Sequence, residues 1–158
     1  MVHNLDFATV VLAVTVAVLL YAAFIDLKHY KISNELILLL IGLFALHAFL
    51  SDRWTSAAWN LGLAAGVFLF LVYFYSRHWI GGGDTKILPV AFLWTGIECA
   101  FLFVLLLLLF VLLHTAAARL GWMESRQDVD SRQRIPFAPS IAAALIATIL
   151  LGCLRSPV

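Results

Sequence analysis

Two aspartates, Asp26 and Asp84, stand at the edges of long apolar runs and have the chemistry best suited to catalysis. Asp26 closes the first apolar run in "FIDLKHYKISNE", and Asp84 follows three glycines in "WIGGGDTKIL". Two carboxylates held close together cannot both ionise, so one of them keeps its proton. The ionised one can take a proton from water while the protonated one polarises a carbonyl group. If the fold brings them together, the pair predicts aspartic-protease chemistry.

The same aspartates also have a structural interpretation. Each can end a helix and face water, and Asp84 would then interact with the dipole at the N-terminus of the following helix. Asp26 fits this less well, because a carboxylate at a helix C-terminus is disfavoured. The glycines Gly81, Gly82 and Gly83 suit the catalytic interpretation, since a bare backbone turns freely and lets a substrate approach closely.

The elements that must position these residues are membrane helices. The chain has 158 residues, of which 64% are hydrophobic and 12% charged, with a mean hydropathy of +1.03. A soluble domain carries about 25% charged residues, so we expect an integral membrane protein in contact with the lipid bilayer. The apolar runs cover residues 7–25, 36–50, 57–75, 87–118 and 137–154.

The fourth run is too long for one crossing. As a single helix it would extend about 48 Å at ~1.5 Å per residue, against ~30 Å of hydrocarbon. The stretch "TGIE" at residues 95–98 interrupts it with a glycine and a carboxylate. We therefore divide the run into two spans, 85–96 and 98–118, which gives six spans in total.

The distribution of basic residues supports six spans. Cytoplasmic loops of membrane proteins are rich in lysine and arginine. With six spans, one side holds eight of the ten basic residues, whereas five spans leave five on each side. The eight are Lys28, Lys31, Arg77, Lys86, Arg119, Arg126, Arg132 and Arg134. The sequence thus predicts an all-α, polytopic membrane protein with one domain over residues 1–158, about six transmembrane helices and both termini outside.

Three motifs in order resemble those of the type IV prepilin peptidase family. "GGGDTKIL" is similar to the family's GxGD motif, and "DLKHYKISN" to its first aspartate motif. "IPFAPSIAAA" resembles the proline-containing stretch that opens the family's last helix. The short chain is most similar to the small peptidases of tight-adherence pilus systems. It has no room for the cytoplasmic domain of larger members, so the resemblance implies no N-methyltransferase activity.

The resemblance also implies roles at the matching positions. Asp26 and Asp84 would be the catalytic pair, and the glycines before Asp84 would shape the loop that presents it. Lys86 would tune the pair electrostatically or contact substrate, or would serve as a positive-inside anchor. Asn34 would have a comparable role near the site, although Ser33 and Asn34 are first of all suited to cap the second span.

The predicted function is therefore removal of the leader peptide from prepilin-like proteins. The enzyme would be a multi-pass protein of the cytoplasmic (inner) membrane with its active site at the cytoplasmic face. An alternative is a small proton- or ion-coupled transporter that uses Asp26 and Asp84 as a relay. Transporters place such groups near the midplane of the membrane and often show repeated halves. Here both aspartates are expected at one face, and the sequence shows no repeat. A further alternative is a non-catalytic pilus assembly subunit.

Other partners and cofactors are not expected. A net charge of +1 offers no basic face for nucleic acid. The histidines lack the spacing of a metal site, so neither a metal nor another cofactor is predicted. Cys99 and Cys153 also lack metal-motif spacing and are interpreted as small residues that pack within the membrane. The sequence sets no oligomeric state.

Overall fold

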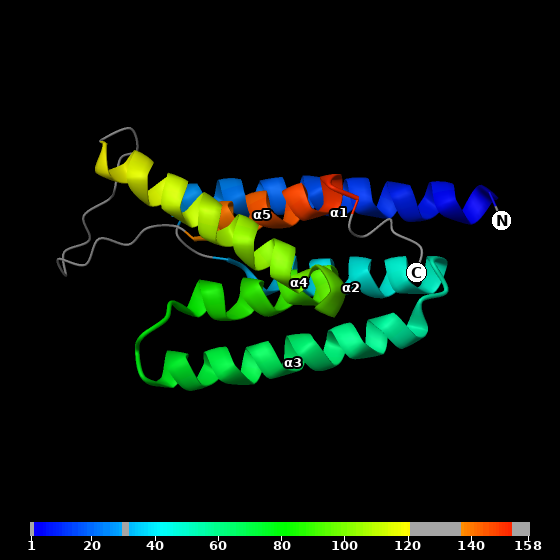
Figure 1. Cartoon of the computed structure of the whole chain (residues 1–158), viewed down its shortest axis with the longest axis horizontal. Helices are drawn as coiled ribbons and strands as arrows, with labels where there is room; N and C mark the ends of the chain where they lie inside the picture. The colour runs from blue at the N-terminus through cyan, green and yellow to red at the C-terminus, as the bar shows by residue number, and fades with distance from the viewer. Residues whose placement is uncertain (1, 30–31, 121–136, 153–158) are drawn as a thin grey trace.

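The structure, a computed structural model, describes residues 2–29, 32–120 and 137–152, and its regular elements there are all helices (Figure 1). The helices are α1 (Val2–His29), α2 (Asn34–Leu50), α3 (Trp54–Ser76), α4 (Gly82–Arg119) and α5 (Ala138–Leu150). The predicted all-α fold is confirmed. Several residues named above lie outside the described part of the chain: Lys31, Arg126, Arg132, Arg134 and Cys153.

The break expected in the fourth apolar run is present at Gly96. This residue has φ 63° and ψ −174°, and the two halves of α4 run in opposite directions from it (Figure 1). Only glycine adopts this backbone conformation without strain. A side chain at Gly96 would also collide with the amide group of Asn60, which projects from α3 against the break. The described part of the chain therefore forms six helical segments from five continuous elements.

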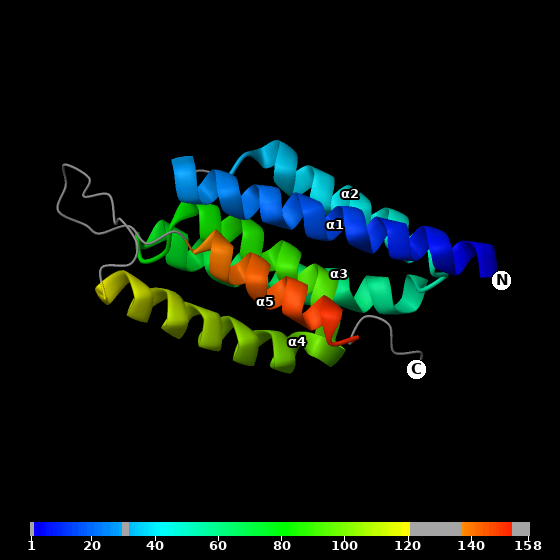
Figure 2. The same cartoon turned by 90° about the horizontal axis from the view of Figure 1, so that it is seen from above.

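The segments lie side by side and alternate in direction. The end of α1, the starts of α2 and α4, and the start of α5 gather at one end of the bundle (Figures 1 and 2). We call this the aspartate end, because it carries Asp26 and Asp84. The opposite, distal end holds the α2–α3 turn at residues 51–53 and the reversal at Gly96.

Three stretches are long and apolar enough to cross a bilayer: Phe7–His29, Trp54–Ser76 and Gly82–Ala117. The last of them includes the reversal at Gly96, and α2 and α5 are apolar but shorter. Large apolar side chains on α3 are exposed, such as Trp59 (69%), Leu69 (68%) and Phe70 (61%). Faces of this kind are unfavourable in water and suit lipid. The fold is that of a multi-pass membrane protein, while the six crossings and the outside termini stay predictions.

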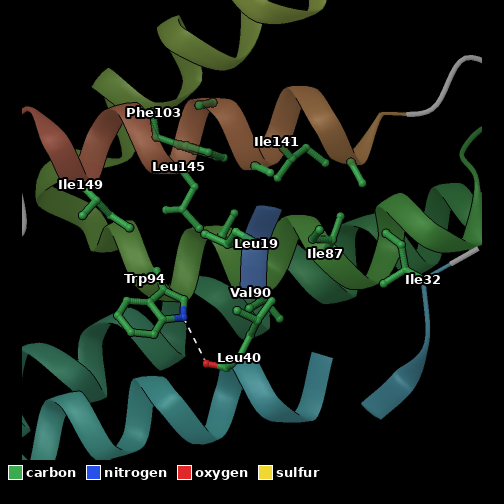
Figure 3. Close-up of a cluster of buried hydrophobic side chains, with 14 of the residues drawn as sticks. Leu19, Ile32, Leu40, Ile87, Val90, Trp94, Phe103, Ile141, Leu145 and Ile149 are labelled. Atoms are coloured by element: carbon green, nitrogen blue, oxygen red, sulfur yellow. Dashed lines mark hydrogen bonds between the residues drawn. The ribbon is translucent and has the colours of Figure 1, made fainter. Parts of the chain in front are cut away.

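α5 is the most enclosed element and holds the bundle together. It lies between α1 and the second half of α4, and it packs on both (Figure 2). Its buried Ile141 and Leu145 contact Leu19 of α1 and Phe103 of α4 in one apolar cluster (Figure 3). In the same cluster the indole of Trp94 donates a hydrogen bond to the Leu40 carbonyl of α2, at 3.1 Å. The site is therefore built on tightly packed helix ends.

Candidate active site

Asp26 lies in the last turn of α1 and is buried, with 7% of its surface exposed. Its Oδ2 accepts a hydrogen bond from the Ala138 backbone N–H, at 3.2 Å. Ala138 is the first residue of α5, where backbone N–H groups have no partner within their own helix and the helix dipole is positive. The carboxylate that is poorly placed at the end of α1 is thus compensated by the start of α5.

Asp84 lies in the first turn of α4, on the opposite side of the site. The turn before it is fixed by Thr85, whose backbone N–H and hydroxyl both donate to the Gly81 carbonyl, at 3.2 and 3.0 Å. Within the described residues no hydrogen bond is made to the Asp84 carboxylate, and the residue is half-buried. Asp84 therefore differs from Asp26, which has a backbone donor.

The two carboxylates are close enough for the charge of Asp26 to act directly on Asp84. They approach each other from helices that do not pack together in the described part of the chain. α2 contacts both helices, and so does α5. The separation of the two carboxylates is consequently set by α2 and α5, the helices packed against both α1 and α4.

The three glycines have different surroundings. A Cβ on Gly81 would lie 3.3 Å from Oδ2 of Asp84, which is tighter than an ordinary contact. A Cβ on Gly82 would lie 3.4 Å from the Tyr75 ring, and one on Gly83 would lie 3.6 Å from Ile32. Gly82 and Gly83 belong to α4, and none of the three has a positive φ. Their absent side chains leave room for neighbours, above all for the Asp84 carboxylate at Gly81.

Lys86 and Asn34 contact each other. The Lys86 ammonium donates a hydrogen bond to Asn34 Oδ1 at 2.8 Å, on an exposed part of the aspartate end. Ser33, as expected, is the N-cap of α2 and accepts from the Leu36 N–H at 3.4 Å. Asn34 is the first residue of α2 and serves Lys86 instead of capping the helix. The pair ties the start of α2 to the start of α4 beside Asp84.

Two features of the site were not anticipated from the sequence. One is the Ala138 N–H, and the other is a contact of 3.2 Å between His114 Nδ1 and Ser140 Oγ. Prolines around residue 138 did indicate a helix start there, since proline favours the first turn. The sequence therefore indicated a helix N-terminus near residue 138, and Asp26 needs a positively polarised partner. Together these two points were the only indication of the Ala138 contact.

The interpretation of Cys99 as a small packing residue was wrong, because Cys99 is disulfide-bonded. It lies at the distal end, three residues after the reversal at Gly96. Cysteine spacing alone does not reveal which helix ends the fold brings together. The chain's other cysteine is Cys153.

A second polar region lies away from the aspartates. A hollow of about 260 Å³ at the distal end is lined by residues that include His47, Arg53, Asn60 and Glu98, and it contains neither aspartate. Among the described residues, no group of three histidines, cysteines or carboxylates is placed to hold a metal ion. The distal hollow and the aspartate end are therefore two separate polar regions.

Comparison with known proteins agrees with this geometry. Residues 13–116, more than half of the chain, match the type IV leader peptidase family. A protein of Bacillus subtilis (strain 168) named prepilin leader peptidase/N-methyltransferase is 30% identical over 143 residues, which cover 88% of this chain. The chain spans about half, 54%, of that relative's length. No solved structure matches the chain. The chain belongs to the type IV leader peptidase family.

Proposed function

We propose that this protein is an aspartic endopeptidase that removes the leader peptide of prepilin-like proteins, with tight-adherence pilins as its substrates. The observation that carries the proposal is the approach of Asp26 and Asp84 at one end of the bundle. Two carboxylates held close together can share one proton, which is the arrangement needed for acid–base cleavage of a peptide bond. The proposal covers peptide cleavage and does not extend to the N-methyltransferase reaction in the relative's name.

The surroundings of the two aspartates assign them different roles. Asp26 receives a hydrogen bond from the Ala138 N–H at the positive end of α5, and such a donor favours the ionised carboxylate. Asp84 has no such donor among the described residues. Asp26 therefore acts as the general base and Asp84 carries the shared proton.

The reaction then proceeds in two steps. Asp26 takes a proton from a water molecule, whose oxygen attacks the scissile carbonyl carbon while Asp84 gives its proton to the carbonyl oxygen. The resulting diol collapses when the proton on Asp26 passes to the leaving nitrogen and Asp84 recovers its own. Because the Asp84 carboxylate accepts no hydrogen bond from the described residues, the substrate carbonyl approaches on the Asp84 side.

The position of the site suits the proposed substrate. Both aspartates lie at helix ends, and Lys28 and Lys86 are exposed beside them. A prepilin crosses from a polar leader to an apolar helix at the level of the membrane surface. A carboxylate pair at helix ends can meet that junction without drawing the leader into the hydrocarbon. A transporter that carries ions across the membrane would instead place its carboxylates near the midplane of the bilayer.

Two independent features favour a cytoplasmic aspartate end. Disulfides persist in oxidising compartments such as the bacterial periplasm, and the disulfide-bonded Cys99 lies at the distal end. Among the described basic residues, Lys28, Arg77, Lys86 and Arg119 are at the aspartate end, whereas Arg53 is at the distal end. This is the distribution of the positive-inside rule.

The test is co-expression with a candidate prepilin, followed by N-terminal sequencing of the pilin. Wild-type protein should yield a pilin shortened by its leader, and Asp26→Asn and Asp84→Asn should leave the precursor intact. Asp52→Asn is the matched control, because Asp52 is exposed at the distal end with φ 52°, a conformation that asparagine tolerates. Full cleavage by either active-site variant would refute the catalytic pair.

Orientation has its own measurement. A cysteine introduced at Asp52 should react with a membrane-impermeant thiol reagent in intact cells, and one at Lys28 should react only after the membrane is opened. Labelling of position 28 from outside would show that the aspartate end faces the wrong compartment for a cytoplasmic cut.

A further inference from the structure

A polar contact joins α4 to α5 near the candidate site. His114, half-buried in the second half of α4, places its Nδ1 3.2 Å from the hydroxyl of Ser140 in the first turn of α5. Ser140 is buried, with 4% of its surface exposed. A serine hydroxyl can donate to a neutral imidazole or accept from a protonated one, so the contact persists in both states.

This contact and the Asp26 contact hold the same turn from two sides. Ala138 and Ser140 are two residues apart in the first turn of α5. The N–H of Ala138 binds Asp26 of α1, and the hydroxyl of Ser140 binds His114 of α4. α1 and α4 do not pack on each other in the described residues, so the first turn of α5 is a link between them.

The sequence of α5 explains why such a link is needed. The helix reads "APSIAAALIATIL", and its buried face includes Ala138, Ala142 and Ala144. Ile141 and Leu145 anchor the middle of the helix in the apolar cluster, whereas the first turn offers only small side chains such as Ala138, so packing restrains rotation of the helix least at its start. A directional hydrogen bond in the first turn supplies the missing restraint. Rotation or sliding of this turn would move the Ala138 N–H away from the Asp26 oxygen.

We infer that His114 and Ser140 form a positioning pair, which fixes the first turn of α5 and thereby the carboxylate of Asp26. The inference rests on the proposed function, in which Asp26 is the general base. Neither residue hydrogen-bonds to Asp26 or Asp84 within the described structure, so their effect passes through the backbone of α5. Both residues therefore influence the rate of the chemical step and leave substrate binding unchanged.

Side-chain geometry provides a selective test. The amide group of asparagine lies about where Nδ1 of histidine lies, whereas the amide of glutamine reaches the position of Nε2. His114→Asn should therefore keep the contact with Ser140 and the wild-type kcat. His114→Gln and Ser140→Ala should lower kcat by about 10- to 100-fold with little change in KM, since displacement of a catalytic group by up to 1 Å costs up to this much.

A spectroscopic readout tests the pair without any substrate. The infrared carboxyl band of Asp26 is the one that Asp26→Asn removes from the wild-type spectrum. This band should shift in His114→Gln and Ser140→Ala and stay in place in His114→Asn. Thr148→Val is the matched control, because among the described residues the buried Thr148 hydroxyl bonds only within α5, to the Ala144 carbonyl at 2.8 Å. The Asp26 band and the kcat of Thr148→Val should remain those of the wild type.

The outcomes separate this inference from the proposed function. If wild-type protein cleaves no prepilin, the proposed function fails, and the infrared band alone decides the positioning pair. The inference is overturned if His114→Gln and Ser140→Ala both keep the wild-type band, or if asparagine at position 114 performs no better than glutamine. A comparable band shift in Thr148→Val would also overturn it, because any lost hydroxyl in α5 would then act alike.

Discussion

Replacing Gly96 by alanine should destabilise the protein by an amount that can be divided between two causes. The first is the backbone conformation, φ 63° and ψ −174°, which costs a residue with a Cβ about 1–3 kcal/mol. The second is the collision of the new Cβ with the Asn60 amide, whose Nδ2 would lie 2.6 Å away. Overpacking of this kind costs about 1–3 kcal/mol. The expected loss is therefore roughly 2–6 kcal/mol in the free energy of unfolding.

A double-mutant cycle separates the two causes. Asn60→Ala in the Gly96→Ala background should recover the part that comes from the collision, about 1–3 kcal/mol, and leave the backbone part. Asn60→Ala alone should change little, because the Asn60 side chain makes no hydrogen bond within the described residues. Unfolding of purified protein in mixed detergent micelles, titrated with a denaturing detergent, gives the four free energies.

Gly66→Ala is the control for the glycine substitution itself. Nothing lies within 4 Å of a Cβ at Gly66, in the middle of α3, so alanine there should be neutral or stabilise by up to about 1 kcal/mol. Wild-type stability of Gly96→Ala would show that the chain does not reverse at this residue. If the Gly96→Ala, Asn60→Ala double mutant is as unstable as Gly96→Ala alone, the collision with Asn60 does not contribute to the loss of stability.

Three further predictions concern the aspartate end and the core. Gly81→Ala should lower kcat for leader removal by roughly 3- to 10-fold, because its Cβ displaces the Asp84 carboxylate by a few tenths of an ångström. Gly83→Ala, whose Cβ makes an ordinary contact, should keep a kcat near that of the wild type, and equal kcat values for the two variants would contradict this. Pilin cleavage by the Asp26→Asn, Asp84→Asn double variant should be no lower than by either single variant, because the pair acts as a unit; additive losses measured in single turnovers would argue for separate roles. Trp94→Phe should lower the detergent melting temperature through a loss of about 1–3 kcal/mol, since the indole hydrogen bond to α2 disappears; an unchanged melting temperature would show that this bond contributes nothing.

Most of the architecture was predictable because membrane thickness constrains it. The fourth apolar run was too long for one crossing, and a glycine stood where the chain had to reverse, so the break at Gly96 followed from length and residue type. The common location of Asp26 and Asp84 followed from the alternation of direction. The helix ends were less predictable. α1 continues to His29, beyond the apolar run that ends at residue 25, and α4 begins at Gly82, before the run that starts at residue 87. In both places the helix extends past the apolar segment into polar residues.

The contacts that shape the site could not be predicted in the same way. Asp26 and Ala138 are separated by 112 residues, and His114 and Ser140 by 26. Hydrophobic periodicity and span counting set which end of the bundle a residue occupies, but they do not set the rotation of a helix about its axis. The same limit explains the error at Cys99, where a disulfide depends on which two helix ends meet.

The hydrogen bond from Ala138 to Asp26 bears on the order in which the proposed site forms during synthesis. Both aspartates precede Ala138 in the sequence, so a partly made chain already contains both carboxylates. The group that holds Asp26 belongs to α5, which follows both of the helices that carry the aspartates. Until α5 has been translated and docked, Asp26 lacks this donor. In the proposed mechanism we therefore expect the general base to be fixed only after α5 is in place.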